Sequence, residues 1–409
     1  MAGRSPAARL FIMADEFAAA GREAVPSLGA GHLPRAAGAT IEERDMQEDT
    51  DLEAAWAAFC DRLKVAGRTV LRPEAPAADL DRAEGYRYLT RLLRAGLERS
   101  VEFADPDFPV FYALSHETIK IGSDNPDNVY RNAVISGDRR YRITGRLGNA
   151  ELLSFGTKAD GLSADGDILS TGEIDIGAMA VDADGRFELI VARDPQPGNW
   201  LPMTQASSML LVRETHGPRT GRIPAEMTIA CLDGPVRPRP LAAATLAAAL
   251  EKTAAFVDVT AGVFADWMVR FQEQPNRFSE IDQAEWRRIG GDPAIFYLWG
   301  YWTLEPDEAL LIESEVPACR YWNVQVNNYW DESLDYRHFQ IHHNNRTARP
   351  EADGRVRILL SHQPMAGWNY VETAGHRCGA IMWRWVSADA HPIPRCQVVK
   401  RADLAPLPG

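Results

Sequence analysis

The chain has 409 residues, of which 45% are hydrophobic and 25% charged, an ordinary balance for a globular protein with a large core. Its formal net charge of −13 argues against a nucleic-acid or anionic membrane partner, because either would require clustered Lys and Arg. The five cysteines are scattered and form no CxxC pair. We therefore expect neither a disulfide framework nor a zinc knuckle. We expect the protein to lie in the cytoplasm, which is a reducing compartment.

The first 105 residues divide into a lead-in and a helical region. Residues 1–45 are rich in Ala, Gly, Pro and Arg without sustained periodicity, so we expect them to be poorly ordered. Residues 46–105 contain two stretches with apolar side chains at helical spacing, and Thr50 and Glu53 form a capping-box pattern in the first. The sequence therefore predicts two amphipathic helices, the second within 79–101.

Strand-like sequence occupies two later regions. From 106 to 235, and again from 296 to 400, short apolar runs are bounded by Gly, Asn and Asp, which is typical of antiparallel strands and turns. Between them lies a linker, 236–295, with an Ala-rich helical pattern at about 240–275. No run approaches the ~18 consecutive apolar residues of a membrane span.

The two strand-like regions repeat one another. Residues 182–200 and 351–369 align at a constant offset of 169 without a gap, and the sequence around Arg213 resembles that around Arg384. Each copy predicts an acidic-Gly turn, a strand buried on both sides, and a Pro-Gly turn. The chain is therefore predicted to be mainly β, with two related antiparallel β-sandwich or jelly-roll units, an N-terminal helical region and a helical linker.

The second unit carries motifs of a known family. The stretch GWNYVETAGHRCGAIMWRW, residues 367–385, resembles the closing signature of the domain-of-unknown-function 1214 family, and NPDNVY (125–130) and PACRYWNVQV (317–326) are similar to other parts of it. The matching signature positions are Asn369, Thr373, Gly375, Gly379, Arg384 and Trp385. Tyr370 and Glu372 stand where that signature usually has Trp and Asp. The resemblance covers roughly 110–400 and implies a β-sandwich fold with little indication of chemistry.

A histidine-rich stretch, residues 320–345, raises the question of a metal site. On a strand, His338 and His342 would share a face about 13 Å apart at ~3.3 Å per residue. Ligands so separated cannot hold one zinc at about 2.0–2.1 Å. We therefore predict exposed or ladder-forming histidines on a β face, and no metal or other cofactor.

The loop from His362 to His376 is the leading candidate site, because it carries polar groups that the other copy lacks. His362, His376 and Glu372 form the predicted proton-transfer set, and Arg384 is the predicted anion clamp. Further candidate ligand-binding residues are Trp368, Asn369, Trp322, Asp127, Tyr130 and Arg142. Asn369, like Asn199 in the first copy, has a competing interpretation as a turn cap, which is a routine role for short amides.

Two functions fit these patterns. The first is a pocket that binds or converts a small, partly apolar molecule. The second is a non-catalytic carbohydrate-binding or interaction module, which the seven tryptophans after residue 298 would serve as an aromatic platform. A small-molecule ligand is the expected partner, and homo-oligomerisation is left open.

Overall fold

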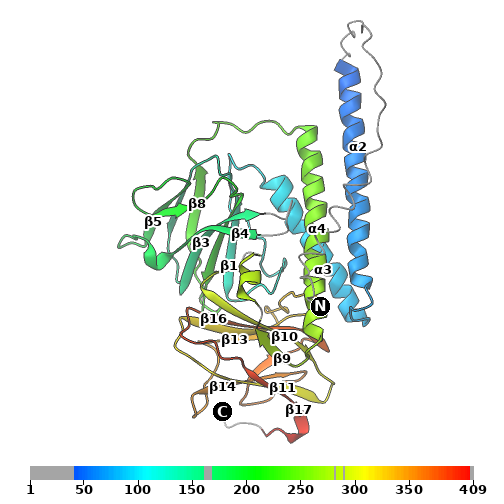
Figure 1. The fold of residues 1–409 in the computed structure, drawn as a ribbon, viewed down its shortest axis with the longest axis vertical. Helices are drawn as coiled ribbons and strands as arrows, with labels where there is room; N and C mark the ends of the chain where they lie inside the picture. The colour runs from blue at the N-terminus through cyan, green and yellow to red at the C-terminus, as the bar shows by residue number, and fades with distance from the viewer. Residues whose placement is uncertain (1–40, 161–167, 281, 289–290, 406–409) are drawn as a thin grey trace, which may run out of the picture.

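The computed structural model describes residues 41–160, 168–280, 282–288 and 291–405. The predicted lead-in lies outside these residues up to position 40, whereas 41–45 belong to a helix. Figure 1 shows two β units, one above the other, with the long helices beside them. The predicted mainly β class, with a helical region, is confirmed. No helix within the described ranges combines the length and apolar character needed to cross a bilayer.

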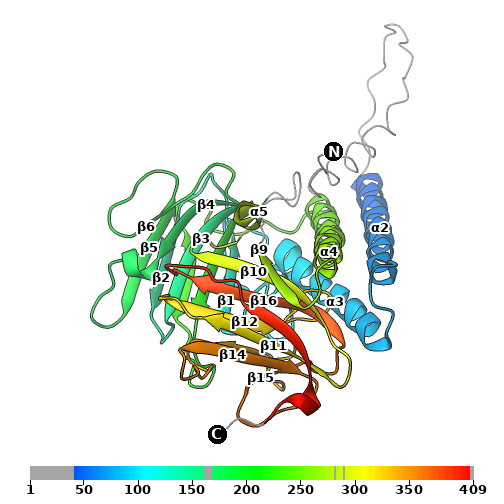
Figure 2. The ribbon, with the colours of Figure 1, turned by 60° about the horizontal axis from the view of Figure 1, so that its bottom comes forward.

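Three helices form the α-helical side of the molecule, which Figures 1 and 2 both show to one side of the sheets. They are α2 (Ile41–Ala66), α3 (Asp79–Leu97) and α4 (Ala243–Gln272), and α4 packs against both of the others. The predicted capping box is wrong, because α2 begins at Ile41 and Thr50 and Glu53 lie inside it. Shorter helical elements are η1 (Gly67–Leu71), η2 (Glu98–Glu102), η3 (Ile176–Ala178), α5 (Gln283–Arg288) and η4 (Arg401–Asp403).

The first β unit consists of two four-stranded sheets. One has the order β1 (Asn128–Val134), β7 (Met209–Thr215), β3 (Leu152–Asp160), β4 (Ile168–Asp175). The other has the order β6 (Trp200–Pro202), β5 (Arg186–Ala192), β2 (Tyr141–Arg146), β8 (Glu226–Cys231). Buried side chains of both sheets, among them Phe155, Val212 and Leu189, share one core, so the sheets pack face to face as a sandwich.

The second unit repeats this arrangement. Its sheets are β10 (Ile295–Thr303), β16 (Cys378–Val386), β12 (Tyr321–Val326), β13 (His342–Asn344), and β15 (Asn369–Glu372), β14 (Arg355–Ser361), β11 (Glu308–Glu315), β17 (Arg395–Lys400). A short strand, β9 (Arg277–Glu280), contacts β10 and β17. In chain order, the strands of both units enter their sheets in the same sequence, including a parallel pair, β5 with β6 and β14 with β15.

The predicted turn, strand and turn are present in both copies of the repeat. Gly185 and Gly354 precede β5 and β14 at φ 79° and 78°, and Gly198 and Gly367 follow at 78° and 83°. These values lie in the left-handed region that glycine adopts without strain. Burial on both sides is found only in part, since β5 alternates between buried and exposed residues and one of its faces meets solvent.

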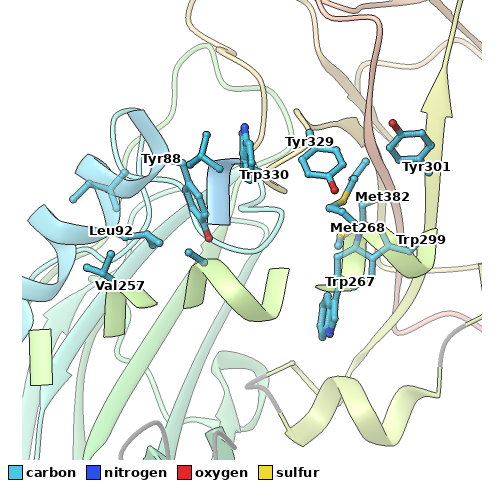
Figure 3. Packing of buried hydrophobic residues seen from close by; sticks show 14 of the residues in the cluster. Tyr88, Leu92, Val257, Trp267, Met268, Trp299, Tyr301, Tyr329, Trp330 and Met382 are labelled. Atoms are coloured by element: carbon cyan, nitrogen blue, oxygen red, sulfur yellow. The ribbon is translucent and has the colours of Figure 1, made fainter. Parts of the chain in front are cut away.

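The helices join the second unit through an aromatic core (Figure 3). Trp267 of α4 meets Trp299 of β10 edge-on at a centroid distance of 5.4 Å, and Trp286 stacks on Trp299 at 3.8 Å. Tyr88 and Leu92 of α3 lie in the same cluster. Rings packed in this way contribute both buried area and geometry. The helices are therefore part of the core and fix one wall of the space between the units.

Candidate functional site

A cavity of about 420 Å³ lies between the two β units. Side chains alternate along a strand, so each sheet has two faces. On β7, Leu210 and Val212 point into the core of the first unit, whereas Met209 and Leu211 line the cavity. On β16, Trp383 belongs to the core of the second unit, and its neighbours on either side face the cavity. One sheet of each unit therefore turns its outer face toward this space.

Most of the cavity wall is apolar. The two sheets supply Met209, Leu211, Ile295 and Met382, and α4 supplies Phe256 and Phe264. Cavities of ~300–1000 Å³ with apolar walls and a few placed polar groups are typical sites for small ligands. The volume and lining therefore fit an organic molecule with an apolar body.

Arg384 is a buried positively charged residue of the cavity wall. Its side chain is only 5% exposed, and it donates from Nη1 to the side-chain oxygens of Asn323 and Gln325 and from Nη2 to the carbonyl oxygen of Ser123. Each of these acceptors is neutral. Arg384 forms no ion pair with any residue that the structure describes, and its Nε–H and one Nη2–H have no acceptor there. The positive charge of Arg384 opposes the rise in pKa that burial causes at the nearby carboxyls of Asp124 and Asp331, but neither carboxyl accepts a hydrogen bond from it. A buried guanidinium whose direct hydrogen-bond partners are all neutral favours an anionic acceptor for its spare N–H groups.

Two tyrosines flank this charge. Tyr130 of β1 pairs in register with Arg213 of β7, and Tyr297 of β10 pairs in register with Arg384 of β16. The Tyr130 hydroxyl accepts the backbone N–H of Asn125 at 2.9 Å, and the Tyr297 hydroxyl accepts that of Asp292 at 3.2 Å. Burial raises the pKa of both phenols, so both keep their protons at neutral pH.

The polar centre of the cavity therefore has an excess of donors. Neither the Tyr130 nor the Tyr297 hydroxyl donates to a described residue, and both lie on the cavity wall with the spare N–H groups of Arg384. The carboxylates on the cavity wall itself are already engaged. Asp124 accepts from the backbone N and Oγ of Ser333 at 3.1 and 2.9 Å. An acceptor with several lone pairs, such as a carboxylate, would satisfy these donors together.

The first unit shows such an arrangement with its own carboxylate. Arg213 occupies on β7 the place that Arg384 occupies on β16, and it lies 3.5 Å from Oδ2 of Asp292. Two further carboxylates at the cavity wall are also paired, Glu173 with Lys158 and Asp175 with Arg320. Of the two equivalent arginines, only Arg384 lacks a carboxylate within the described chain.

A solved structure of an uncharacterised protein from Burkholderia cenocepacia matches this fold with 46% sequence identity and a TM-score of 0.84. The match covers 87% of this chain and 99% of that chain. The chain belongs to the family of this Burkholderia protein. The VPA0106 protein from Vibrio parahaemolyticus is 11% identical with a TM-score of 0.46, covers 78% of this chain and 98% of its own, and is too distant to inform the site. No family model and no curated protein matches the chain, so the resemblance to the domain-of-unknown-function 1214 family stays a prediction.

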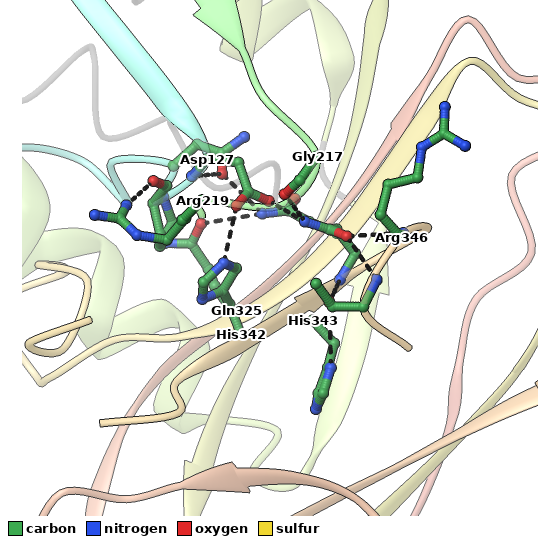
Figure 4. A network of polar contacts seen from close by, with 12 residues as sticks. Asp127, Gly217, Arg219, Gln325, His342, His343 and Arg346 are labelled. Atoms are coloured by element: carbon green, nitrogen blue, oxygen red, sulfur yellow. Dashed lines mark hydrogen bonds and ion pairs between the residues drawn. The ribbon is translucent and has the colours of Figure 1, made fainter. Parts of the chain in front are cut away.

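A second polar cluster of the protein lies beside the cavity (Figure 4). The carboxylate of Asp127 is fully buried and accepts from Nε2 of His342 at 2.9 Å, the hydroxyl of Tyr321 at 2.7 Å and Nδ2 of Asn344 at 2.6 Å. Asp127 precedes β1, whereas its three donors belong to β12 and β13. This carboxylate therefore links the first unit to the second.

The histidines differ from the sequence-based expectation. The strand contains only 342–344, and His338 lies in a preceding turn, so the predicted shared strand face is wrong. His342 and His343 are buried at 8% and 9% exposure, so they are not exposed, but both pair with β12 and meet the ladder-forming alternative. Burial lowers the pKa of His343 to about 4. Within the described ranges, no three or more His, Cys, Asp or Glu side chains are grouped so as to hold a metal ion.

The three residues of the predicted proton-transfer set each contact a different part of the protein. Nδ1 of His362 lies 2.9 Å from Oγ1 of Thr373, and Nδ1 of His376 lies 3.4 Å from Asp81 of α3. The backbone N–H of Glu372 donates to the carbonyl of Gln340 at 2.7 Å. His362, His376 and Glu372 do not line the cavity. Their assignment as a proton-transfer set stays a prediction.

The side chain of Asn369 hydrogen-bonds backbone groups of two remote segments, not of its own turn. Its Oδ1 accepts the backbone N–H of Arg349 at 2.8 Å, and its Nδ2 donates to the carbonyls of Arg349 and Arg357 at 2.8 and 2.9 Å. Asn199 makes the same set of contacts, with Ala180 and Glu188. Both asparagines thus fix the backbone entering the parallel strand that follows.

The remaining candidates divide between core, surface and cavity. Trp322 stacks on Trp383 inside the second unit at a centroid distance of 5.0 Å. Trp368 donates from Nε1 to the carbonyl of Ala405 at 3.2 Å, and Arg142 lies at the surface, 3.4 Å from Glu188. Of all the predicted site residues, the cavity brings together Tyr130 and Arg384.

Sequence reasoning missed Tyr297 and Ser123, which both line the cavity. A signal for Tyr297 existed in the repeat, because Arg213 and Arg384 occupy matching places and each has a tyrosine on the neighbouring strand. No comparable pattern marks Ser123, whose position depends on a turn conformation.

Proposed function

We propose that the protein binds a small carboxylate with an apolar body in the cavity between its β units. The excess of donors at Arg384, Tyr130 and Tyr297 is the observation that carries this proposal. The carboxylate would accept the spare N–H groups of Arg384 and the two phenolic O–H groups. Its apolar part would lie against the sheet and α4 side chains that form the rest of the wall.

Neutral ligands fit this centre less well. A primary amide would direct N–H donors toward donors, and a sugar would place hydroxyls against apolar walls, at a desolvation cost of ~1–3 kcal/mol for each unpaired polar group. The tryptophans also give little support to an aromatic sugar platform, because Trp299, Trp302, Trp330, Trp383 and Trp385 are all fully buried. A pocket for an anionic organic molecule is therefore favoured over the carbohydrate-binding alternative.

We also infer that the two units arose by internal duplication. Three observations support this inference: the repeat at an offset of 169, the matching strand orders of the corresponding sheets in the two units, and the equivalent contacts of Asn199 and Asn369. In this view Arg213 and Arg384 descend from one position. One arginine then acquired a carboxylate partner from the chain itself, and the other kept its place for a ligand.

Replacing Arg384 with Gln should weaken carboxylate binding by about 10- to 100-fold, because a hydrogen bond to a charged group contributes ~1.5–3 kcal/mol and 1.4 kcal/mol is tenfold in affinity. Isothermal titration with decanoate measures the effect, and decanamide provides a probe of the same length without charge. We expect decanoate to bind and decanamide to bind at least tenfold more weakly.

Arg142→Gln is the matched control, because this arginine lies at the surface away from the cavity. It should bind decanoate with wild-type affinity. Equal affinity of wild type for the acid and the amide, or unchanged decanoate binding by a folded Arg384→Gln variant, would show that the cavity is not a carboxylate site.

A further inference from the structure

A strained turn lies beside the polar centre of the cavity. Gly122 and Ser123 both adopt left-handed conformations, at φ 59° and 53°, and both line the cavity. Asp331 is left-handed as well, at φ 56°, and its carbonyl accepts the backbone N–H of Ser123 at 2.7 Å. Non-glycine residues at positive φ cost about 1–3 kcal/mol each and cluster at functional sites.

The side chains of this turn form a serine–carboxylate pair. Oγ of Ser123 donates to Oδ1 of Asp331 at 2.5 Å, and Nδ2 of Asn327 donates to both of these oxygens. The other carboxylate oxygen, Oδ2 of Asp331, is buried without a hydrogen-bond partner in the described structure. Arg384 donates to the carbonyl oxygen of the same serine, so the pair directly adjoins the donor-rich centre.

We propose that Ser123 is a nucleophile, with Asp331 as its base, and that the cavity hydrolyses esters of the carboxylate that it binds. This inference rests on the proposed function, because the product of such a reaction is an apolar carboxylate. A hydroxyl is a weak nucleophile until an adjacent base removes its proton, and the 2.5 Å contact supplies that base. The donors of Arg384, Tyr130 and Tyr297 would stabilise the oxyanion as well as the product.

The reaction is balanced with water as the second substrate. As Oγ of Ser123 bonds to the ester carbon, its proton passes to Asp331 and the carbonyl oxygen becomes an anion. When the carbonyl reforms, the bond to the alcohol breaks and the leaving oxygen takes the proton from Asp331. Water then gives a proton to Asp331 and attacks the acyl carbon, and Oγ recovers that proton as it leaves. The products are an alcohol and a carboxylic acid, which ionises.

The environment of Asp331 suits it to this role. Burial raises its pKa to about 7, whereas hydrogen bonds from Ser123 and Asn327 and the charge of Arg384 oppose the rise and Asp124 adds to it. General bases are most effective when their pKa lies near the working pH. Because only the carboxylate form accepts a proton, the reaction rate should rise with pH up to about 7 and level off above it.

The test uses the intact protein with two reagents. Decylphosphonofluoridate ethyl ester should modify Ser123 covalently with loss of fluoride, as intact-mass and peptide mass spectrometry would detect. Hydrolysis of p-nitrophenyl decanoate should give a pH profile with its midpoint near 7. Ser123→Ala should lose both signals, and Asp331→Asn should lose at least 100-fold in both rates and lose the pH midpoint.

Ser314→Ala is the control, since this serine is buried on β11 of the second unit and outside the cavity. It should react as wild type does. Decanoate binding with no labelling at Ser123, labelling only at another residue, or equal turnover by Ser123→Ala would overturn the nucleophile assignment and leave the proposed binding function intact. If the wild-type protein does not bind decanoate, the proposed binding function, on which the inference rests, is itself wrong.

Discussion

Replacing Asp127 with Ala should lower the free energy of unfolding by about 3 kcal/mol or more, since each buried donor left without a partner costs ~1–3 kcal/mol. In the variant, His342, Tyr321 and Asn344, all on the second unit, would each lose the carboxylate acceptor of a hydrogen bond. Because the carboxylate joins the two units, we expect the loss to affect their docking as well as the local turn. Urea unfolding followed by tryptophan fluorescence measures the change.

Asp307→Ala is the control for this experiment. Asp307 is exposed and pairs with Lys400 at 2.9 Å, and exposed ion pairs contribute ~0–1 kcal/mol. If Asp127→Ala costs no more than Asp307→Ala, the buried cluster does not hold the units together.

Replacing Asp331 with Asn should stabilise the protein, and more so at high pH. Burial raises the folded-state pKa of Asp331 to about 7, above the ~3.9 of an unfolded chain. Between these values the native state binds more protons, so wild-type stability falls as the pH rises toward 7. At ~1.4 kcal/mol for each unit of pKa, the stability gain of the variant should be about 2–3 kcal/mol larger at pH 8 than at pH 5.

Asp353→Asn provides the comparison, because this carboxyl is exposed and its hydrogen bond with Arg357 lowers its pKa. It remains ionised from pH 5 to 8, so the stability difference of this variant should be constant over that range. Chemical denaturation at both pH values tests the pair. A constant difference for Asp331→Asn as well would mean that Asp331 does not titrate near 7.

The sequence was informative where local patterns determine structure. The glycines at 185 and 354 mark turns because φ near +80° is strained for other residues, and the apolar runs after them form strands. The start of α2 was less predictable, because capping patterns such as Thr50 with Glu53 also occur inside helices whose ends are fixed elsewhere.

The cavity could not be predicted in the same way, because it depends on how two sheets and α4 pack together. Tyr130 and Tyr297 become equivalent only through strand register, which places each opposite an arginine. The two tyrosines are separated by fewer positions than the two arginines, so a gapless alignment of the repeat hides the match. His338 and His342 do not share a strand face, because a turn at Asp335 to Phe339 leaves only three residues for the strand.

A crystal structure of the protein with decanoate bound tests the carboxylate site most directly. We predict that the carboxylate will lie within ~3 Å of Arg384 and of the Tyr130 and Tyr297 hydroxyls, at hydrogen-bond distance. The alkyl chain should lie between β7, β16 and α4, against Leu211, Met382 and Phe264. Decanoate bound at another place, with the cavity between the units empty at saturating ligand, would show that this cavity is not the carboxylate site.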